Sequence, residues 1–139
     1  MVDVHTLEIL PTVEELNAAV GRAFLARLRT LINEAGADSR VNLAISGGAI
    51  TASLLPSLLP HVNQIDWSRV RVWLVDERYV PAGDEDRNDD QAWEGFFHAA
   101  IGVEFVRMPT SDASAPGAGS LDEATAAFAA TWRELMGER

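Results

Sequence analysis

The sequence contains no cysteine, and this absence excludes disulfide bonds, thiolate metal ligands and a cysteine nucleophile. Long apolar runs are also missing, because no stretch approaches the roughly 18 apolar residues from which a transmembrane helix is predicted. The N-terminal region has acidic and helix-capping residues where a secretory signal needs a basic start and an apolar stretch. From these absences we expect a cytoplasmic protein without a membrane partner.

Basic residues are scarce, with 11 Lys and Arg against 21 Asp and Glu, which gives a formal net charge of -10. Nucleic-acid binding depends largely on cations that replace counterions along the phosphates, so this balance argues against a nucleic-acid partner. A small phosphorylated ligand remains compatible with the charge, because it needs only a local group of hydrogen-bond donors.

The 139 residues, 47% of them hydrophobic, predict a single domain over residues 1–139. Short β-forming or apolar runs predict strands at residues 6–10, 41–45, 70–75 and 103–107. Helices are predicted between them, after Thr12, through residues 54–59, at residues 89–100 and after Ser120. This alternation predicts an α/β fold, a Rossmann-like three-layer αβα arrangement with a mostly parallel sheet and ligands beyond the carboxyl ends of its strands.

Two of the predicted helix starts carry a capping-box pattern, Thr12 with Glu15 and Ser120 with Glu123. In the helix through residues 54–59, Pro56 predicts either a kink or a start later than the preceding turn. The first helix has an apolar stripe that predicts a core face, formed by Val13, Leu16, Val20, Phe24, Leu28, Leu31 and Ile32. Residues 109–120 are rich in small and turn-forming residues, so we expect a flexible surface loop with no catalytic role.

The run Ser46-Gly47-Gly48-Ala49 lies between a predicted strand and a predicted helix. Glycines in this position let backbone N–H groups approach an anion, and a helix start adds partial positive charge, so the run is a candidate phosphate-binding loop. The alternative is that the two glycines only form a tight strand-to-helix turn.

A second polar turn, Asp76-Glu77-Arg78, follows the strand predicted at residues 70–75. The carboxyl ends of parallel strands lie at one edge of the sheet, so the two turns are expected to face one crevice. There Arg78 has the paired donors that bind a phosphate or carboxylate, and Asp76 can orient a hydroxyl or accept a proton. The alternative is an exposed ion pair between neighbouring side chains.

Residues 41–88 resemble 6-phosphogluconolactonases, within a wider group of sugar-phosphate isomerases and deaminases that includes glucosamine-6-phosphate deaminase. Three features carry the resemblance in order and spacing: the Ser46-Gly47-Gly48 turn, the run IDWS at residues 65–68, and the run DERYVP at residues 76–81 with the stretch that ends at Asn88. The Asp-Glu-Arg form is closer to the lactonases than to the deaminases. The whole chain is similar to the first part of such a protein and is shorter than the family.

The resemblance implies hydrolysis of 6-phosphoglucono-1,5-lactone to 6-phosphogluconate in the oxidative pentose phosphate pathway, with no metal or organic cofactor. It implies that the Ser46–Ala49 loop holds the phosphate, that Asp76 and Arg78 line the pocket as catalytic residues, and that Asn88 braces their loop. Family members also have a histidine in a later Gly-x-Asp-Gly-His segment as the general base, and this sequence has no such segment. None of its three histidines, His5, His61 and His98, is predicted to replace it.

Two alternative functions remain, a sugar-phosphate-binding module without turnover, and a deaminase or isomerase of the same wider group. The partner expected in each case is a small phosphorylated sugar. A parallel sheet that lacks some of the family's strands exposes an unpaired strand edge, so self-association or a complementary C-terminal chain is also predicted.

Overall fold

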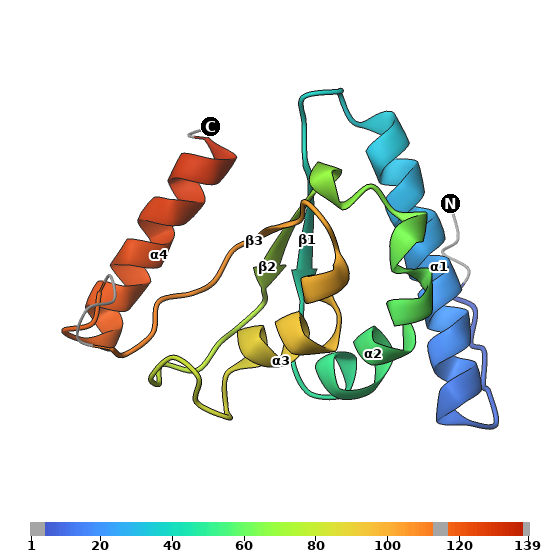
Figure 1. Cartoon of the computed structure of the whole chain (residues 1–139), viewed down its shortest axis with the longest axis horizontal. Coiled ribbons are helices and arrows are strands. Elements are labelled where there is room, and N and C mark those ends of the chain that lie inside the picture. Colours follow the sequence, from blue (N-terminus) through green and yellow to red (C-terminus); the bar gives the residue numbers. More distant parts are fainter. Residues whose placement is uncertain (1–4, 113–116, 138–139) are drawn as a thin grey trace.

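The computed structural model describes residues 5–112 and 117–137, and it centres on a sheet of three parallel strands (Figure 1). The strands lie in the order β1 (Val41–Ile45), β2 (Val70–Leu74) and β3 (Glu104–Phe105). Two further backbone bonds extend the ladders, from Val75 N to Ile45 O and from Val106 N to Val72 O, both 2.9 Å. The predicted α/β class with a parallel sheet is confirmed.

Helix α1 (Val13–Glu34) begins at Thr12, whose hydroxyl accepts a hydrogen bond of 3.1 Å from Glu15 N, as predicted. Helix α1 enters the core from its middle onwards, where Gly21, Leu25 and Leu28 are buried. The prediction was wrong for the start of the apolar stripe, which is exposed at Val13, Leu16 and Val20. A helix of 22 residues extends about 33 Å, whereas a strand of five residues extends about 17 Å, so the first turns of α1 reach beyond the sheet.

The helical segment after β1 changes its hydrogen-bond pattern twice. It begins as the π-helix η1 (Ile50–Leu54), continues as α2 (Leu55–Ser57) and ends as the 3₁₀-helix η2 (Leu59–Gln64). Pro56 lies in the first turn of α2, where a missing N–H removes no helical hydrogen bond. The prediction of a helix that begins later than the glycine turn is therefore confirmed for its α-helical part.

The helix predicted at residues 89–100 is divided into α3 (Asn88–Gly95) and the 3₁₀-helix η4 (Phe97–Ala99). Gly95 ends α3, and it packs so tightly that a Cβ there would lie 3.3 Å from Thr51 O. The predicted core side is confirmed at Phe96 and Phe97, which are fully buried and pack edge to face against Trp67. These aromatic rings join α3, η4 and the 3₁₀-helix η3 (Trp67–Arg69) into the main core.

Helix α4 (Leu121–Met136) covers the face of the sheet opposite the other helices, which completes three layers (Figure 1). It begins at Ser120, whose hydroxyl accepts from Glu123 N at 3.1 Å, so the second predicted cap is also confirmed. Trp73 of β2 points to this face, and its ring centroid lies 4.7 Å from that of Trp132 and 6.1 Å from that of Phe128. Aromatic packing on one strand therefore fixes α4 to the sheet.

Residues 6–10 do not form the predicted strand. Leu7 and Ile9 are 83% and 82% exposed, and within the described residues β1 pairs only with β2. A β-forming sequence becomes a strand only when another strand accepts its backbone hydrogen bonds, and residues 6–10 have no such neighbour. In the predicted loop 109–120, residues 113–116 lie outside the described part, and the described residues beside them form no helix or strand.

Candidate functional site

The two polar turns predicted from the sequence follow β1 and β2 at the same edge of the sheet. The bond from Val75 N to Ile45 O, 2.9 Å long, continues the ladder to the point where both turns begin. Ser46 and Asp76 are exposed there, immediately beyond the paired strands. We call this edge, formed by residues 46–49, 76–78 and 88, the rim.

Asn88, the first residue of α3, connects the two turns. Its side-chain amide donates to Asp76 O at 3.4 Å. On its other side it lies directly against Gly47, so closely that a Cβ on residue 47 would overlap the Asn88 amide. The two turns therefore lie close together at the rim, and Asn88 contacts both of them.

The glycine turn presents backbone donors at the rim. Gly48 has a φ of +64°, a conformation that favours glycine. Its carbonyl accepts from Ala52 N at 2.9 Å and from Thr51 Oγ1 at 3.1 Å, whereas no backbone carbonyl in the described part accepts from the N–H of Gly47 or Gly48. Ala49 and Arg78 are also exposed at the rim, so this edge carries both amide donors and a cation, which are groups that can bind an anion.

Glu77 is a residue whose role the sequence did not reveal. Its side chain is only 2% exposed, although it lies between the exposed residues Asp76 and Arg78. One carboxylate oxygen accepts from Arg78 N at 2.9 Å and from Asn88 N at 2.8 Å, and the other accepts from Asp89 N at 2.8 Å. Glu77 thus caps the N-terminus of α3, and the alternative of an exposed ion pair between neighbouring side chains is wrong.

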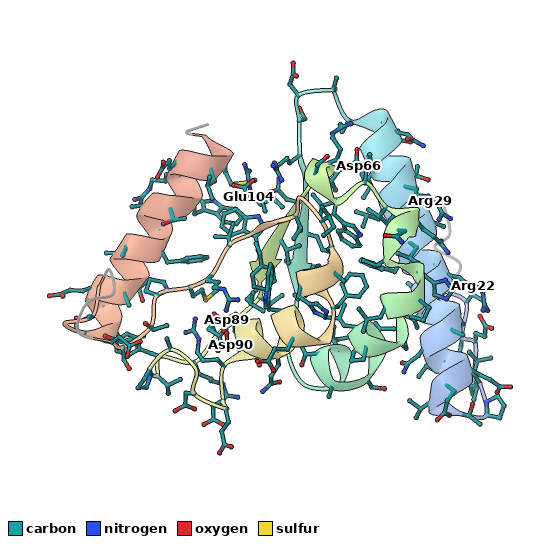
Figure 2. The ribbon with its side chains drawn as sticks, in the orientation of Figure 1. Arg22, Arg29, Asp66, Asp89, Asp90 and Glu104 are labelled. Atoms are coloured by element: carbon teal, nitrogen blue, oxygen red, sulfur yellow. The ribbon has the colours of Figure 1, made fainter. Side chains whose placement is uncertain are left out.

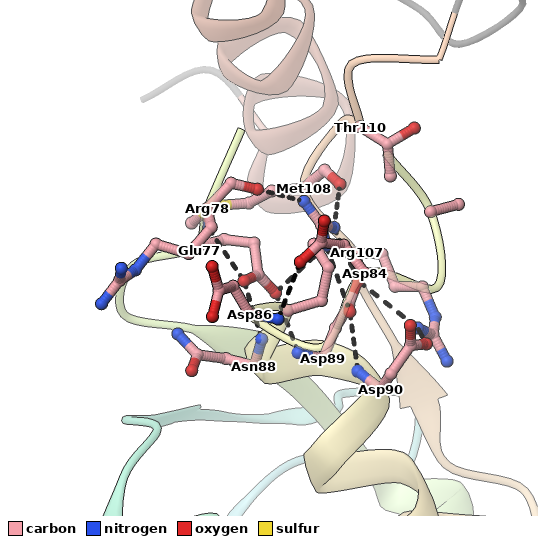
Figure 3. Close-up of polar contacts among 12 residues, drawn as sticks. Glu77, Arg78, Asp84, Asp86, Asn88, Asp89, Asp90, Arg107, Met108 and Thr110 are labelled. Carbon is pink, nitrogen blue, oxygen red and sulfur yellow. Dashed lines mark hydrogen bonds and ion pairs between the residues drawn. The ribbon is translucent and has the colours of Figure 1, made fainter. Parts of the chain in front are cut away.

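Glu77 forms a buried charged cluster with Arg87 and Asp89, which we call the Arg87 cluster. Figure 3 shows Glu77 and Asp89 with the polar contacts around them. The Arg87 side chain is 1% exposed and lies 2.6 Å from Asp89 Oδ2 and 3.6 Å from Glu77 Oε2. It also donates to the carbonyls of Arg78 and Met108, both at 2.8 Å. These bonds join the turn after β2 to the segment after β3.

Burial and nearby positive charge act in opposite directions on the pKa of Asp89. Burial alone would raise the pKa of Asp89, but the hydrogen bonds and positive charge of Arg87, the charge of Arg107 and the N–H of Asp90 together hold it below its ordinary value of 3.8. Arg107 lies 3.3 Å from Asp89 and is 40% exposed, so it is the weaker of the two cations. Asp89 therefore stays ionised at neutral pH inside the fold.

This lowered pKa predicts how stability depends on pH. Because the pKa is lower in the folded chain, the stabilisation from Asp89 is present above the unfolded value of 3.8 and is lost as the pH falls through the folded value. We expect the free energy of unfolding of the native chain to exceed that of Asp89→Asn at pH 6, with the difference shrinking below about pH 4. Urea unfolding of both chains from pH 6 to pH 3 measures it, and a constant difference would contradict the prediction.

The histidines were the other candidate catalytic residues. The three histidines are exposed; the ring nitrogens of His61 and His98 bond to Gln64 and to Trp93 O, and none of the three contacts the rim. Figure 2 shows Asp89 and Asp90 near the rim end of the sheet, with Asp66 and Glu104 towards the other end. Within residues 5–112 and 117–137, no cluster of three His, Asp or Glu residues suited to a metal occurs, and no helix is long and apolar enough to span a membrane.

One groove of the described residues lies away from the rim, and a second adjoins the rim at Ser46. The larger, of about 720 Å³, runs between α1 and η2 and is lined by Gly21, Leu25 and His61 among others. The smaller, of about 250 Å³, is mostly apolar and includes Ser46 at one end, next to Ile45. Neither groove is lined by Asp76 or Arg78.

The family model described as glucosamine-6-phosphate isomerases/6-phosphogluconolactonase matches residues 11–139. The chain belongs to this family. Family members that resemble it include a 6-phosphogluconolactonase of Mycobacterium tuberculosis, 31% identical over 88% of this chain and 49% of that protein. Another is a 6-phosphogluconolactonase of Streptomyces coelicolor, 33% identical over 79% of this chain and 43% of that protein. The chain thus spans about half the length of these relatives.

Solved structures of family members share the fold. The 6-phosphogluconolactonase of Leishmania guyanensis superposes with a TM-score of 0.70 at 22% identity, over 96% of this chain and 51% of that one. The 6-phosphogluconolactonase of Shewanella baltica superposes with a TM-score of 0.64 at 24% identity, over 86% of this chain and 48% of that one. This chain therefore shares its α/β fold with these two 6-phosphogluconolactonases.

Proposed function

We propose that this chain forms the phosphate-binding part of a 6-phosphogluconolactonase, which hydrolyses 6-phosphoglucono-1,5-lactone to 6-phosphogluconate in the oxidative pentose phosphate pathway. The observation that carries the proposal is the contact of Gly47 with Asn88, through which the glycine turn meets the Asp76–Arg78 turn. Membership of a family whose curated relatives are named 6-phosphogluconolactonase supports it. The protein acts in the cytoplasm in this proposal.

At the rim, the N–H groups of Gly47 and Gly48 bind the phosphate, and Arg78 contributes a charged, two-pronged donor. Asp76 accepts from a sugar hydroxyl and orients the lactone ring. In the reaction, the oxygen of water bonds to the lactone carbonyl carbon and the ring carbon–oxygen bond breaks. The ring oxygen takes up a proton and becomes a hydroxyl, and the new carboxylic acid loses a proton to solvent and becomes a carboxylate. The base that takes the proton from water is the histidine of the Gly-x-Asp-Gly-His segment, which these 139 residues do not contain.

The chain alone is therefore expected to bind 6-phosphogluconate without hydrolysing the lactone. Calorimetry measures the binding, and a pH-stat assay measures hydrolysis above the spontaneous rate. Hydrolysis at a rate typical of complete enzymes, retained after replacement of His5, His61 and His98, would refute the need for the added histidine. Absence of binding by the unmodified chain would refute the proposed function itself.

Replacement of Arg78 by alanine tests the assignment of the rim. A charge-assisted hydrogen bond contributes about 1.5–3 kcal/mol, so Arg78→Ala is expected to weaken 6-phosphogluconate binding by about 10- to 150-fold. The Arg78 side chain is exposed, so the melting temperature is expected to stay within about 2 °C of the native value. An unchanged dissociation constant would place the phosphate elsewhere.

We also propose that the chain associates with itself or with a complementary chain through the outer edge of β1. In the described residues that edge has no strand beside it, and such edges are normally covered or paired. The expected result is a mass above that of the 15.1 kDa monomer in light scattering at high concentration. A stable monomer under those conditions would contradict this expectation.

A further inference from the structure

The backbone of Arg78 is held on both sides by buried side chains. Its N–H donates to Glu77 Oε1 at 2.9 Å, and its carbonyl accepts from Arg87 Nη1 at 2.8 Å. Glu77 and Arg87 are 2% and 1% exposed at their side chains, whereas Arg78 itself is exposed at the rim. The exposed Arg78 side chain therefore extends from a backbone that the buried side chains of Glu77 and Arg87 hold in place.

The same two side chains anchor that backbone to other parts of the fold. Glu77 also accepts the N–H groups of Asn88 and Asp89, both at 2.8 Å, which ties the turn to the start of α3. Arg87 also donates to Met108 O at 2.8 Å, which ties the turn to the segment after β3. The position of Arg78 thus depends on contacts with two separate elements.

The stability of the fold is a weak reason for this arrangement. The attraction within a buried ion pair is largely offset by the cost of removing its charges from water. Apolar residues of similar size often stabilise a fold equally well. A gain in binding is a stronger reason, because a donor held in its binding position loses less conformational entropy when an anion binds. The Arg87 cluster is placed where it provides that gain.

We propose that Glu77 and Arg87 are positioning residues that hold the Arg78 backbone so that its guanidinium meets the phosphorylated substrate, a role that rests on the function proposed above. Neither side chain is exposed at the rim, and both act through Arg78. The assignment therefore predicts that their effect on binding disappears when the Arg78 side chain is removed.

A double-mutant cycle tests this dependence. Affinity for 6-phosphogluconate is measured by calorimetry, and by ligand-observed NMR titration in the weak range, for the native chain, Arg87→Lys, Arg78→Ala and the double variant. Arg87→Lys keeps the charge but loses the planar donors, and it is expected to weaken binding about tenfold in the native background. In the Arg78→Ala background, the same change is expected to weaken binding by less than about twofold.

A matched control comes from Arg71, which forms a similar, partly buried bond of 2.7 Å with Glu104 away from the rim. Arg71→Lys is expected to lower the melting temperature and to leave the dissociation constant unchanged. Glu77→Gln provides a second variant of the proposed pair if Arg87→Lys does not fold, and its effect is likewise expected to vanish without the Arg78 side chain.

The outcomes separate the two proposals. If the native chain binds, Arg78→Ala weakens that binding, and the effects of Arg87→Lys or Glu77→Gln simply add to it, the positioning role is wrong and the proposed function stands. An equal loss of affinity in Arg71→Lys would likewise assign the effect to general destabilisation. If the native chain does not bind 6-phosphogluconate, the proposed function and the positioning role both fall.

Discussion

Replacement of Arg87 by alanine is expected to destabilise the chain by about 3–5 kcal/mol, because it leaves buried carboxylates without their main cation. Glu77 and Asp89 are 2% and 3% exposed at their side chains, and Arg87 lies within 3.6 Å and 2.6 Å of them. Arg107 lies 3.3 Å from Asp89 but is 40% exposed, so it replaces only part of the lost interaction. Urea unfolding at pH 7 measures the change in the free energy of unfolding.

The control for this experiment neutralises the whole cluster. In the triple variant Arg87→Met, Glu77→Gln and Asp89→Asn, no buried charge is left without a partner, so much of the lost stability is expected to return. A loss below about 1 kcal/mol for Arg87→Ala alone would show that water or Arg107 already compensates the two carboxylates, and that the Arg87 cluster contributes little.

Gly47→Val is expected to abolish measurable binding of 6-phosphogluconate and to cost about 1–3 kcal/mol of stability. Any Cβ at residue 47 overlaps the side-chain amide of Asn88, whose backbone is fixed by its bond to Glu77. The Asn88 side chain must therefore leave its place, which breaks its bond to Asp76 O and separates the two turns. Calorimetry with 6-phosphogluconate and thermal unfolding measure the two effects.

Gly83→Ala is the matched control, since Gly83 has a φ of +79° and its added methyl group would meet no atom within 4 Å. This substitution strains a glycine in the loop between β2 and α3 without touching Asn88, so it is expected to reduce stability by about 1 kcal/mol and to leave binding intact. Binding retained by Gly47→Val would show that the phosphate does not depend on the contact between the turns.

Much of the arrangement of the candidate site was predictable, because its two turns directly follow two strands. Apolar runs placed β1 and β2, and parallel strands put the turns after them at one edge, where Gly47, Asp76 and Asn88 do meet. The Arg87 cluster was not predictable in the same way. Glu77 caps α3 from 11 residues before Asn88, and no local capping pattern marks a donor–acceptor pair so far apart in the sequence.

The sequence by itself determined both capped helices and the glycine turn, because their hydrogen bonds close within a few residues. It also located the β-forming runs that become β1 and β2, although their hydrogen bonds join residues 29 positions apart. Tertiary structure alone decided which β-forming segment finds a partner, and residues 6–10 remain outside the sheet because none is beside them. It also decided which charges are buried. The Glu77 side chain is buried and the neighbouring Arg78 is exposed. Their sequence positions do not decide this difference, because burial and pairing depend on groups distant in the chain.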